Sequence, residues 1–218
     1  MTTREVFDEI APGWYSFRHH SIFRTELEEM AGRWRRGRLV NVGCGHGADF
    51  IPFKDSFELH GVDFSRGMLE NAVKYSRKFR FSVSLVAADA DNLPFLSDTF
   101  DWAIAIATYH HIKDREDRLL AFRELYRVLR PGGEAFITVW NRRQPRFWLK
   151  SGDAMVPWQA GDRTIHRYYH LFTYGELKKT AQRAGFEVVK ISPESSYKFP
   201  FRTFSRNICL LVRKQKPS

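Results

Sequence analysis

A run of apolar residues that ends in three alternating glycines is the feature that most limits how this chain can fold. Residues 39–50 read LVNVGCGHGADF, with Gly43, Gly45 and Gly47 directly after the hydrophobic run. A buried strand, a tight glycine turn and the start of a helix place unpaired backbone N–H groups at the carboxyl edge of a parallel sheet. The stretch therefore predicts a nucleotide-like cofactor site in an α/β fold.

The chain alternates between strand-like and helix-like segments. The strand-like runs are 38–43, 57–63, 81–89, 100–107 and 134–140. Helix-like patterns cover 67–78 and 115–129, and the RPGG sequence at 130–133 is expected to stop the second helix and turn the chain into the next strand. Such alternation is typical of βαβ units, so the sequence predicts a doubly wound parallel sheet.

The predicted organisation is one domain over residues 1–218. An N-terminal helical cap (1–37) precedes a cofactor-binding core (38–140), and an irregular insertion (141–172) is expected over the carboxyl edge of the sheet. The last part (173–218) is expected to hold a final helix and a pair of terminal strands.

Composition limits where the protein works and what it binds. No apolar run approaches the roughly 18 residues of a membrane span, and two cysteines, Cys44 and Cys209, make no disulfide framework, so we expect a cytoplasmic protein without membrane contact. The net charge is +10 over 218 residues, and the basic clusters contain aromatic residues. This pattern favours a nucleic acid partner, although each cluster alone could be a solvated helix face.

Two cofactors compete for the glycine loop. Gly43, Gly45 and Ala48 formally satisfy G-x-G-x-x-G/A, a weak signal for a dinucleotide. The alternating spacing through Gly47 instead resembles the first motif of class I S-adenosylmethionine-dependent methyltransferases. Asp63, at the end of the second strand-like run, can accept hydrogen bonds from ribose hydroxyls and suits either cofactor.

Two further stretches decide in favour of S-adenosylmethionine. AADADNLPFLSDTFDWAIAIATYHHI and FRELYRVLRPGGEAFITVW are similar to later motifs of the same methyltransferases, in the same order. The resemblance implies a Rossmann-like seven-stranded sheet with N-terminal helices and an insertion after strand 5, and it places Asp89, Ala90 and Ala107 at the cofactor. Asn41 stands where the family usually has Asp or Glu, and the lost charge costs on the order of 1 kcal/mol.

The flanking segments resemble one methyltransferase family, which esterifies 5-carboxymethyluridine at the wobble position of tRNA. The similar stretches are VFDEIAPGWYSFRHH, IATYHHI, HRYYHLFTYGEL and RNICLLVRK. The acid needs cations and hydrogen-bond donors to position it, and the candidates are Arg18, His110, His111, Arg167, Tyr169 and Arg206. Of these we expect Arg18, His110 and Arg167 to position the acid, and Tyr169 or Tyr168 to stack on the base.

The chemistry needs alignment more than a general base, because the carboxylate that receives the methyl group is already ionised at neutral pH. No metal is predicted, since His166 and His170 lie four residues apart without an evident third ligand. Plainer interpretations remain: His110 could be a satisfied core imidazole, and the tyrosines could simply pack the insertion onto the sheet.

The resemblance also implies partners. The tRNA anticodon stem-loop would be the substrate, and a small zinc-ribbon activator protein would dock on the edge strand at 81–89, unless Arg77, Lys78 and Arg80 shield that edge. Two other functions stay open: a small-molecule methyltransferase of the same fold, and a non-catalytic RNA-binding relative, for which Asn41 is the best argument.

Overall fold

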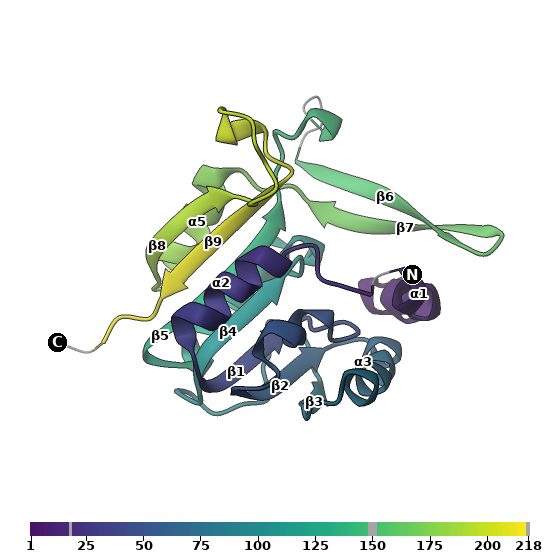
Figure 1. Ribbon diagram of the computed structural model, residues 1–218. Helices are drawn as coiled ribbons and strands as arrows, with labels where there is room; N and C mark the ends of the chain where they lie inside the picture. The colour runs from purple at the N-terminus through teal and green to yellow at the C-terminus, as the bar shows by residue number, and fades with distance from the viewer. Residues whose placement is uncertain (18, 148–151, 217–218) are drawn as a thin grey trace.

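The predicted sheet forms the centre of the molecule. The computed structural model describes residues 1–17, 19–147 and 152–216. Seven strands run in the order β3-β2-β1-β4-β5-β9-β8 (Figure 1). The first five are parallel to one another, and β9 runs antiparallel to both β5 and β8. This confirms the Rossmann-like doubly wound fold, including the terminal strand pair.

The elements follow the predicted alternation closely. The helices are α1 (Thr3–Phe17), α2 (Arg24–Trp34), α3 (Arg66–Phe79), α4 (Arg115–Val128) and α5 (Tyr174–Arg183). The strands are β1 (Gly37–Val42), β2 (Phe57–Asp63), β3 (Ser84–Ala87), β4 (Phe100–Ile106), β5 (Leu129–Trp140), β6 (Asp153–Ala160), β7 (Arg163–His170), β8 (Glu187–Pro193) and β9 (Asn207–Arg213). None of the helices in the described ranges has the length and apolar character to cross a membrane.

Side chains that alternate along the central strands build a core on each face of the sheet. On β1, Val40 belongs to a buried cluster with residues of α4 and α5, whereas Leu39 belongs to a second cluster with residues of α2. Both faces are covered, so the central strands are mostly apolar, with Asn41 as a buried polar exception on β1. Polar side chains such as that of Asp63 lie where these strands end, at the carboxyl edge of the sheet.

The predicted N-terminal cap is helical, and α1 is fastened to the start of α3. Asp8 accepts hydrogen bonds from the Ser65 hydroxyl at 2.6 Å and from the Gly67 N–H at 3.2 Å. The Asn71 amide donates to the Ala11 carbonyl at 2.7 Å. These contacts hold α1 beside the carboxyl edge of the sheet (Figure 1).

The insertion is more regular than predicted. Instead of irregular chain, β6 and β7 form an antiparallel hairpin that extends from the sheet toward α1 (Figure 1). Its turn contains Gly161, whose φ of 60° suits a tight hairpin. The alternation was hidden because Pro157 lies inside one strand and the charged Arg167 lies on the buried face of the other.

Two boundaries also differ from the prediction. RPGG does not separate α4 from the next strand, because β5 already begins at Leu129 and takes in the whole turn, with an irregular register opposite Phe100 and Trp102. The edge strand is shorter than expected, since only Ser84–Ala87 pairs with β2. It is nevertheless the terminal strand of the sheet.

Candidate active site

The glycine loop connects β1 to a short 3₁₀ turn at Ala48–Phe53. The φ angles of Gly43, Gly45 and Gly47 are 72°, 52° and 90°, in the region that favours glycine. A β-carbon on Gly43 would lie 2.3 Å from Cγ2 of Thr108, whereas one on Gly45 would meet nothing within 4 Å. The loop is therefore packed against β4 at its first glycine and open at its second.

Asp63 ends β2 and ties the loop to the second strand. Its Oδ2 accepts a hydrogen bond from the Gly45 N–H at 2.8 Å, and its Oδ1 accepts one from the Ser65 N–H at 2.9 Å. Burial raises the pKa of Asp63 to about 6, and the two N–H donors only partly offset it. Each carboxylate oxygen has more than one lone pair, so ribose hydroxyls could still bind.

Two pockets meet at the glycine loop. We call them the inner pocket and the outer pocket, and both are lined by Gly43, Asp63, Phe64, Thr108 and His111. The inner pocket continues to residues of α1, the end of β5 and the hairpin, and the outer pocket continues past the end of β3. A continuous groove of this kind suits an elongated cofactor with a nucleoside at one end and an amino acid at the other.

Asp89 and Ala90 line the outer pocket. The resemblance implies that Asp89 contacts the adenine amino group of the cofactor; in the structure its carboxylate already has a partner on α1. Its Oδ2 accepts a hydrogen bond from Nη2 of Arg4 at 2.7 Å, in an ion pair whose side chains are 55% and 52% exposed. The ion pair therefore joins α1 to the nucleoside side of the groove.

Ala107 lies between the groove and the sheet. Its φ of 55° is unusual for a residue with a side chain, and it lines the inner pocket directly after β4. Its N–H donates to the Thr138 carbonyl at 3.1 Å and to the Thr138 hydroxyl at 2.9 Å. Backbone held this way commonly marks a functional position.

Asn41 is the predicted cofactor residue with the most unusual surroundings. Its side chain is fully buried, and in the described parts of the chain neither Oδ1 nor Nδ2 has a hydrogen-bond partner. An unsatisfied buried amide costs about 1–3 kcal/mol, which a partner supplied by a ligand would recover. This orphaned amide and the open face of Gly45 fit a cofactor that carries an ammonium group.

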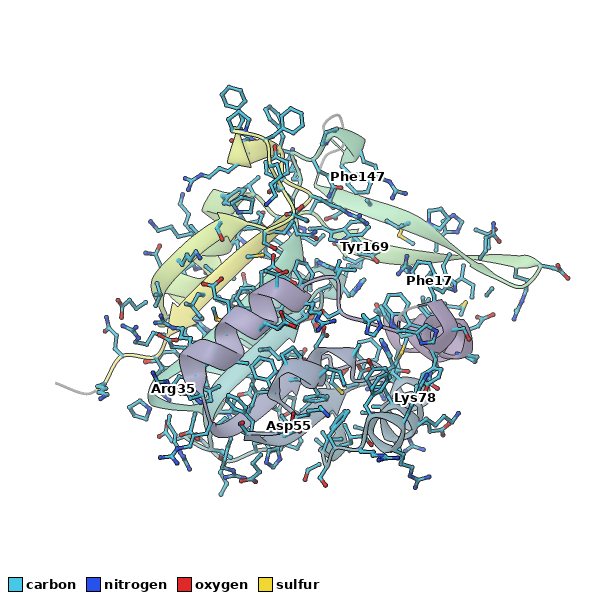
Figure 2. All side chains as sticks on the ribbon, in the orientation of Figure 1. Phe17, Arg35, Asp55, Lys78, Phe147 and Tyr169 are labelled. Atoms are coloured by element: carbon cyan, nitrogen blue, oxygen red, sulfur yellow. The ribbon has the colours of Figure 1, made fainter. Side chains whose placement is uncertain are left out.

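The far wall of the inner pocket is aromatic. The Tyr169 ring stacks on Trp140 with centroids 4.2 Å apart and on His110 at 4.9 Å, and all three line the pocket. Nδ1 of His110 accepts the Trp140 N–H at 3.2 Å, which fixes the imidazole against β5. Figure 2 shows Tyr169 between the end of the sheet and the hairpin. This stack supplies a flat apolar surface opposite the glycine loop.

The neighbouring His111 is a neutral group. Its Nδ1 lies 2.9 Å from the Tyr168 carbonyl, so this nitrogen carries a proton and donates. Burial, together with the charge of Arg167, lowers the pKa of His111 to about 3. His111 therefore contributes shape and no charge to the pocket.

Arg167 lies behind the aromatic wall. Its guanidinium carbon is 5.5 Å from the Trp14 ring, 5.0 Å from the Trp158 ring and 5.4 Å from the Tyr169 ring. Its side chain is almost fully buried, although guanidinium groups rarely are. The cation thus joins α1 to both strands of the hairpin and gives this side of the pocket a positive charge.

Of the remaining residues predicted to position the acid or the base, the two in the described part of the chain do not line the inner pocket. Arg18 lies outside the described residues. Tyr168 alternates to the other face of β7, where its hydroxyl lies 3.5 Å from the Lys113 carbonyl. Arg206 is exposed beside the Trp140 ring. Of the two tyrosines, Tyr169 is therefore the one placed for stacking.

The sequence-based prediction missed several aromatic lining residues, namely Phe7, Trp14, Phe64 and Trp140. Two signals could have identified them: Phe7 and Trp14 share one face of α1, and Phe64 and Trp140 stand at the carboxyl ends of β2 and β5.

The residue types that bind metals do not form a site in the described part of the chain. These residues contain no group of three that could hold a metal ion, and the His170 imidazole instead contacts the carboxylates of Asp153 and Glu176.

Cofactor affinity is expected to depend on pH through Asp63. Its folded-state pKa of about 6 lies above the ordinary value of 3.8, so it is protonated as the pH falls through 6 and loses the charge that ribose hydroxyls would meet. We expect S-adenosylmethionine affinity to be constant above about pH 7 and to fall by up to roughly tenfold per pH unit below 6. Calorimetric titration from pH 5 to 8 measures this, and Asp63→Asn should remove the dependence.

Replacing Asn41 with the usual acid is expected to separate binding from stability. In Asn41→Asp the carboxylate can pair with a cofactor ammonium, so affinity should rise roughly fivefold, about 1 kcal/mol. Without cofactor the charge is buried and unpaired, so the melting temperature should fall. Asn41→Leu is the matched control, expected to stabilise the free protein and weaken binding. Lower affinity in Asn41→Asp than in wild type would remove Asn41 from the cofactor site.

Comparison with known proteins agrees with this geometry. The methyltransferase domain pattern matches residues 39–133, which include the glycine loop and Asp63. A protein of Encephalitozoon cuniculi named as a methyltransferase is 29% identical over 190 residues, which are 84% of this chain and 84% of that protein. The tRNA (carboxymethyluridine(34)-5-O)-methyltransferase of Saccharomyces cerevisiae is 34% identical over 164 residues, covering 71% of this chain. The chain matches 55% of that longer yeast protein.

Solved structures show the same fold at low sequence identity. An S-adenosylmethionine-dependent methyltransferase from Clostridium acetobutylicum superposes with a TM-score of 0.73 at 15% identity, over 88% of this chain and 91% of that one. A Haloferax volcanii methyltransferase, solved in complex with the Trm112 methyltransferase activator, superposes with a TM-score of 0.68 at 18% identity. The match covers 100% of this chain and 99% of that one. The matched domain, the sheet order and the groove at the glycine loop together show that this chain belongs to the class I S-adenosylmethionine-dependent methyltransferases.

Proposed function

We propose that this methyltransferase esterifies the carboxylate of 5-carboxymethyluridine at the wobble position of tRNA, giving 5-methoxycarbonylmethyluridine. The observation that carries the proposal is the stacked aromatic wall of Tyr169, Trp140 and His110, which faces the glycine loop and has the Arg167 cation behind it. A flat wall backed by a positive charge suits a planar base that carries a carboxylate. The name of the yeast relative supports the same substrate.

The residues divide between the two ends of the groove. We assign Asn41, Gly43, Gly45, Gly47, Asp63, Asp89, Ala90 and Ala107 to the cofactor. Bound there, S-adenosylmethionine supplies a methyl group on a positively charged sulfur. Tyr169 and His110 would hold the base, and the charges of Arg167 and Arg18 would orient its acid, with Arg167 acting from behind Tyr169.

The transfer needs no proton movement by the protein. S-adenosylmethionine held by the glycine loop and Asp63 would supply the methyl group, and an ionised substrate carboxylate would accept it without first losing a proton. The neutral His111 agrees with such a site. Its pKa of about 3 makes the imidazole too weak a base to take a proton from a substrate at neutral pH. Excluding water and aligning the two reactants provide the rate enhancement.

Transfer of labelled methyl to bulk tRNA, followed by mild alkali, tests the substrate. A methyl ester releases its label as methanol, whereas methyl groups on nitrogen, carbon or ribose keep theirs. Alkali-labile label on tRNA from a strain that makes the carboxymethyl group is expected. Stable label would discard the carboxylate acceptor, and no label would favour a small-molecule substrate or a non-catalytic RNA-binding protein.

A zinc-ribbon activator is the protein partner that we propose, in the cytoplasm, where the free thiols of Cys44 and Cys209 would stay reduced. The terminal strand β3 is paired on one side in the described sheet, and Leu85 and Val86 on it are only half-buried. A solved relative of this fold is itself a complex with a methyltransferase activator. Co-purification with such a protein, and higher cofactor affinity in the complex, is the expected result; a monomer with full activity would contradict it.

A further inference from the structure

The segment between β8 and β9 carries large apolar side chains that point into solvent. Phe199 is 74% exposed, Phe201 67% and Phe204 42%. Figure 2 shows rings that project outward from this segment, at the end of the sheet where Tyr169 lies. Exposed aromatic residues at this density are uncommon on a soluble surface and indicate a binding site.

The backbone beneath these rings is held in place. The Asn141 amide donates to the Thr203 and Ser205 carbonyls, both at 2.8 Å. The buried Glu194 accepts the N–H groups of Arg206 at 3.2 Å and Asn207 at 2.8 Å. The aromatic residues are therefore presented on a fixed support rather than left outside the core by a loose loop.

The exposed charged residues around the rings are all positive, and the carboxylate of Glu194 in the same segment is buried. The exposed basic residues of this surface are Lys198, Arg202 and Arg206 on the segment itself and Arg142, Arg143 and Arg146 on the neighbouring one. The two segments are joined by the Asn141 N–H, which donates to the Arg206 carbonyl at 3.0 Å. Among the described residues, none of the six forms an ion pair with a carboxylate. We call these six residues and the three phenylalanines the platform.

The platform is continuous with the inner pocket. Another pocket beside it is lined by Arg206, Ser196 and Phe17, and also by His20 and Ile22. His20 and Ile22 line the inner pocket as well. A chain whose base enters the inner pocket would therefore meet Arg206 and then the exposed rings.

We propose that the platform binds the single-stranded nucleotides that flank the target base in the anticodon loop of tRNA; this rests on the proposed function and extends it. Aromatic faces stack on bases of any sequence, and arginines neutralise phosphates. Separated rings among six cations suit a polyanion with spaced planar groups better than an apolar protein surface. The platform thus holds the strand while the inner pocket holds its base.

Binding to unmodified RNA without cofactor tests the platform apart from the reaction. In Phe199→Ala with Phe201→Ala, affinity for a short RNA hairpin with a single-stranded loop should fall roughly 10- to 100-fold by fluorescence anisotropy, while affinity for a blunt duplex stays unchanged. In Arg202→Ala with Arg206→Ala, both RNAs should bind more weakly, with a shallower salt dependence.

Matched controls lie at the opposite end of the sheet. Arg35 and Arg36 are exposed just before β1, and Figure 2 shows Arg35 far from Tyr169. Alanine at both should leave hairpin affinity within twofold of wild type, and Leu96→Ala, an 84% exposed apolar side chain, serves the same purpose for the rings. Cofactor affinity should be unchanged in every variant.

Three results would overturn the proposal: wild-type protein that does not bind the hairpin, hairpin affinity unchanged in the phenylalanine variant, or that variant losing attachment to anionic phospholipid vesicles and not to RNA. Weaker hairpin binding together with alkali-stable methyl label would refute the ester chemistry and leave the platform intact. Alkali-labile label together with unchanged hairpin binding in the phenylalanine variant would refute the platform and leave the ester chemistry intact.

Discussion

Replacing Asp63 with alanine is expected to abolish measurable cofactor binding. The carboxylate accepts the N–H groups of Gly45 and the buried Ser65, so its removal leaves both donors without this partner and loosens the glycine loop. It also removes the acceptor proposed for the ribose hydroxyls. The two hydrogen bonds proposed from the ribose hydroxyls to this charged group are each worth about 1.5–3 kcal/mol. Their loss lowers cofactor affinity on the order of 100-fold or more.

Calorimetry with S-adenosylmethionine and with S-adenosylhomocysteine measures this loss, alongside a thermal melt that reports folding. Asp89→Ala is the control, because this carboxylate is half exposed and forms an ion pair with Arg4. Its loss should cost less than about tenfold in affinity, since exposed polar contacts contribute little. Equal effects at the two positions would show that Asp63 has no special role.

Replacing Arg167 with alanine is expected to reduce methyl transfer to tRNA by about 100-fold or more, with cofactor affinity within twofold of wild type. The guanidinium contacts the rings of Trp14, Trp158 and Tyr169, and each desolvated cation–π contact contributes up to about 2 kcal/mol. Its removal frees Tyr169 to move and takes away the charge that would orient the substrate acid.

Two variants separate positioning from simple loss of stability. Arg167→Lys keeps the charge without the planar group, so we expect partial recovery of the melting temperature and a methyl transfer rate still roughly tenfold low. Arg163→Ala removes an ion pair between the exposed Arg163 and the mostly buried Glu9 across the same contact between α1 and the hairpin, and it should leave transfer unchanged. If Arg163→Ala and Arg167→Ala slow transfer equally, the effect belongs to the attachment of α1 and not to the cation.

The central sheet could be predicted because its determinants are local. A buried parallel strand such as β1 or β4 is a mostly apolar run, and the glycines after β1 impose a turn that few other residues permit. The hairpin could not be recognised by the same rules. Its buried face alternates Ile165, Arg167 and Tyr169, and a charged residue in that row hides the apolar alternation.

The site could be predicted only where single segments build it. Asp63 follows its strand and could be placed from that alone. The surroundings of Arg167 depend on Trp14 from α1 and Trp158 from β6, and nothing in the local sequence of β7 indicates that these rings would enclose it. The orphaned amide of Asn41 likewise becomes visible only when all neighbouring strands are in place.

The ion pair between Arg4 and Asp89 has a consequence for the order in which ligands bind. Under the proposed adenine contact, the cofactor and Arg4 compete for one carboxylate, and the exposed pair holds with about 1 kcal/mol or less. A cofactor that takes Asp89 therefore releases an arginine at the rim of the groove. The loaded enzyme would then present one more free cation to an incoming phosphate backbone than the empty enzyme, so RNA is expected to bind the loaded enzyme more tightly, which favours cofactor binding before RNA.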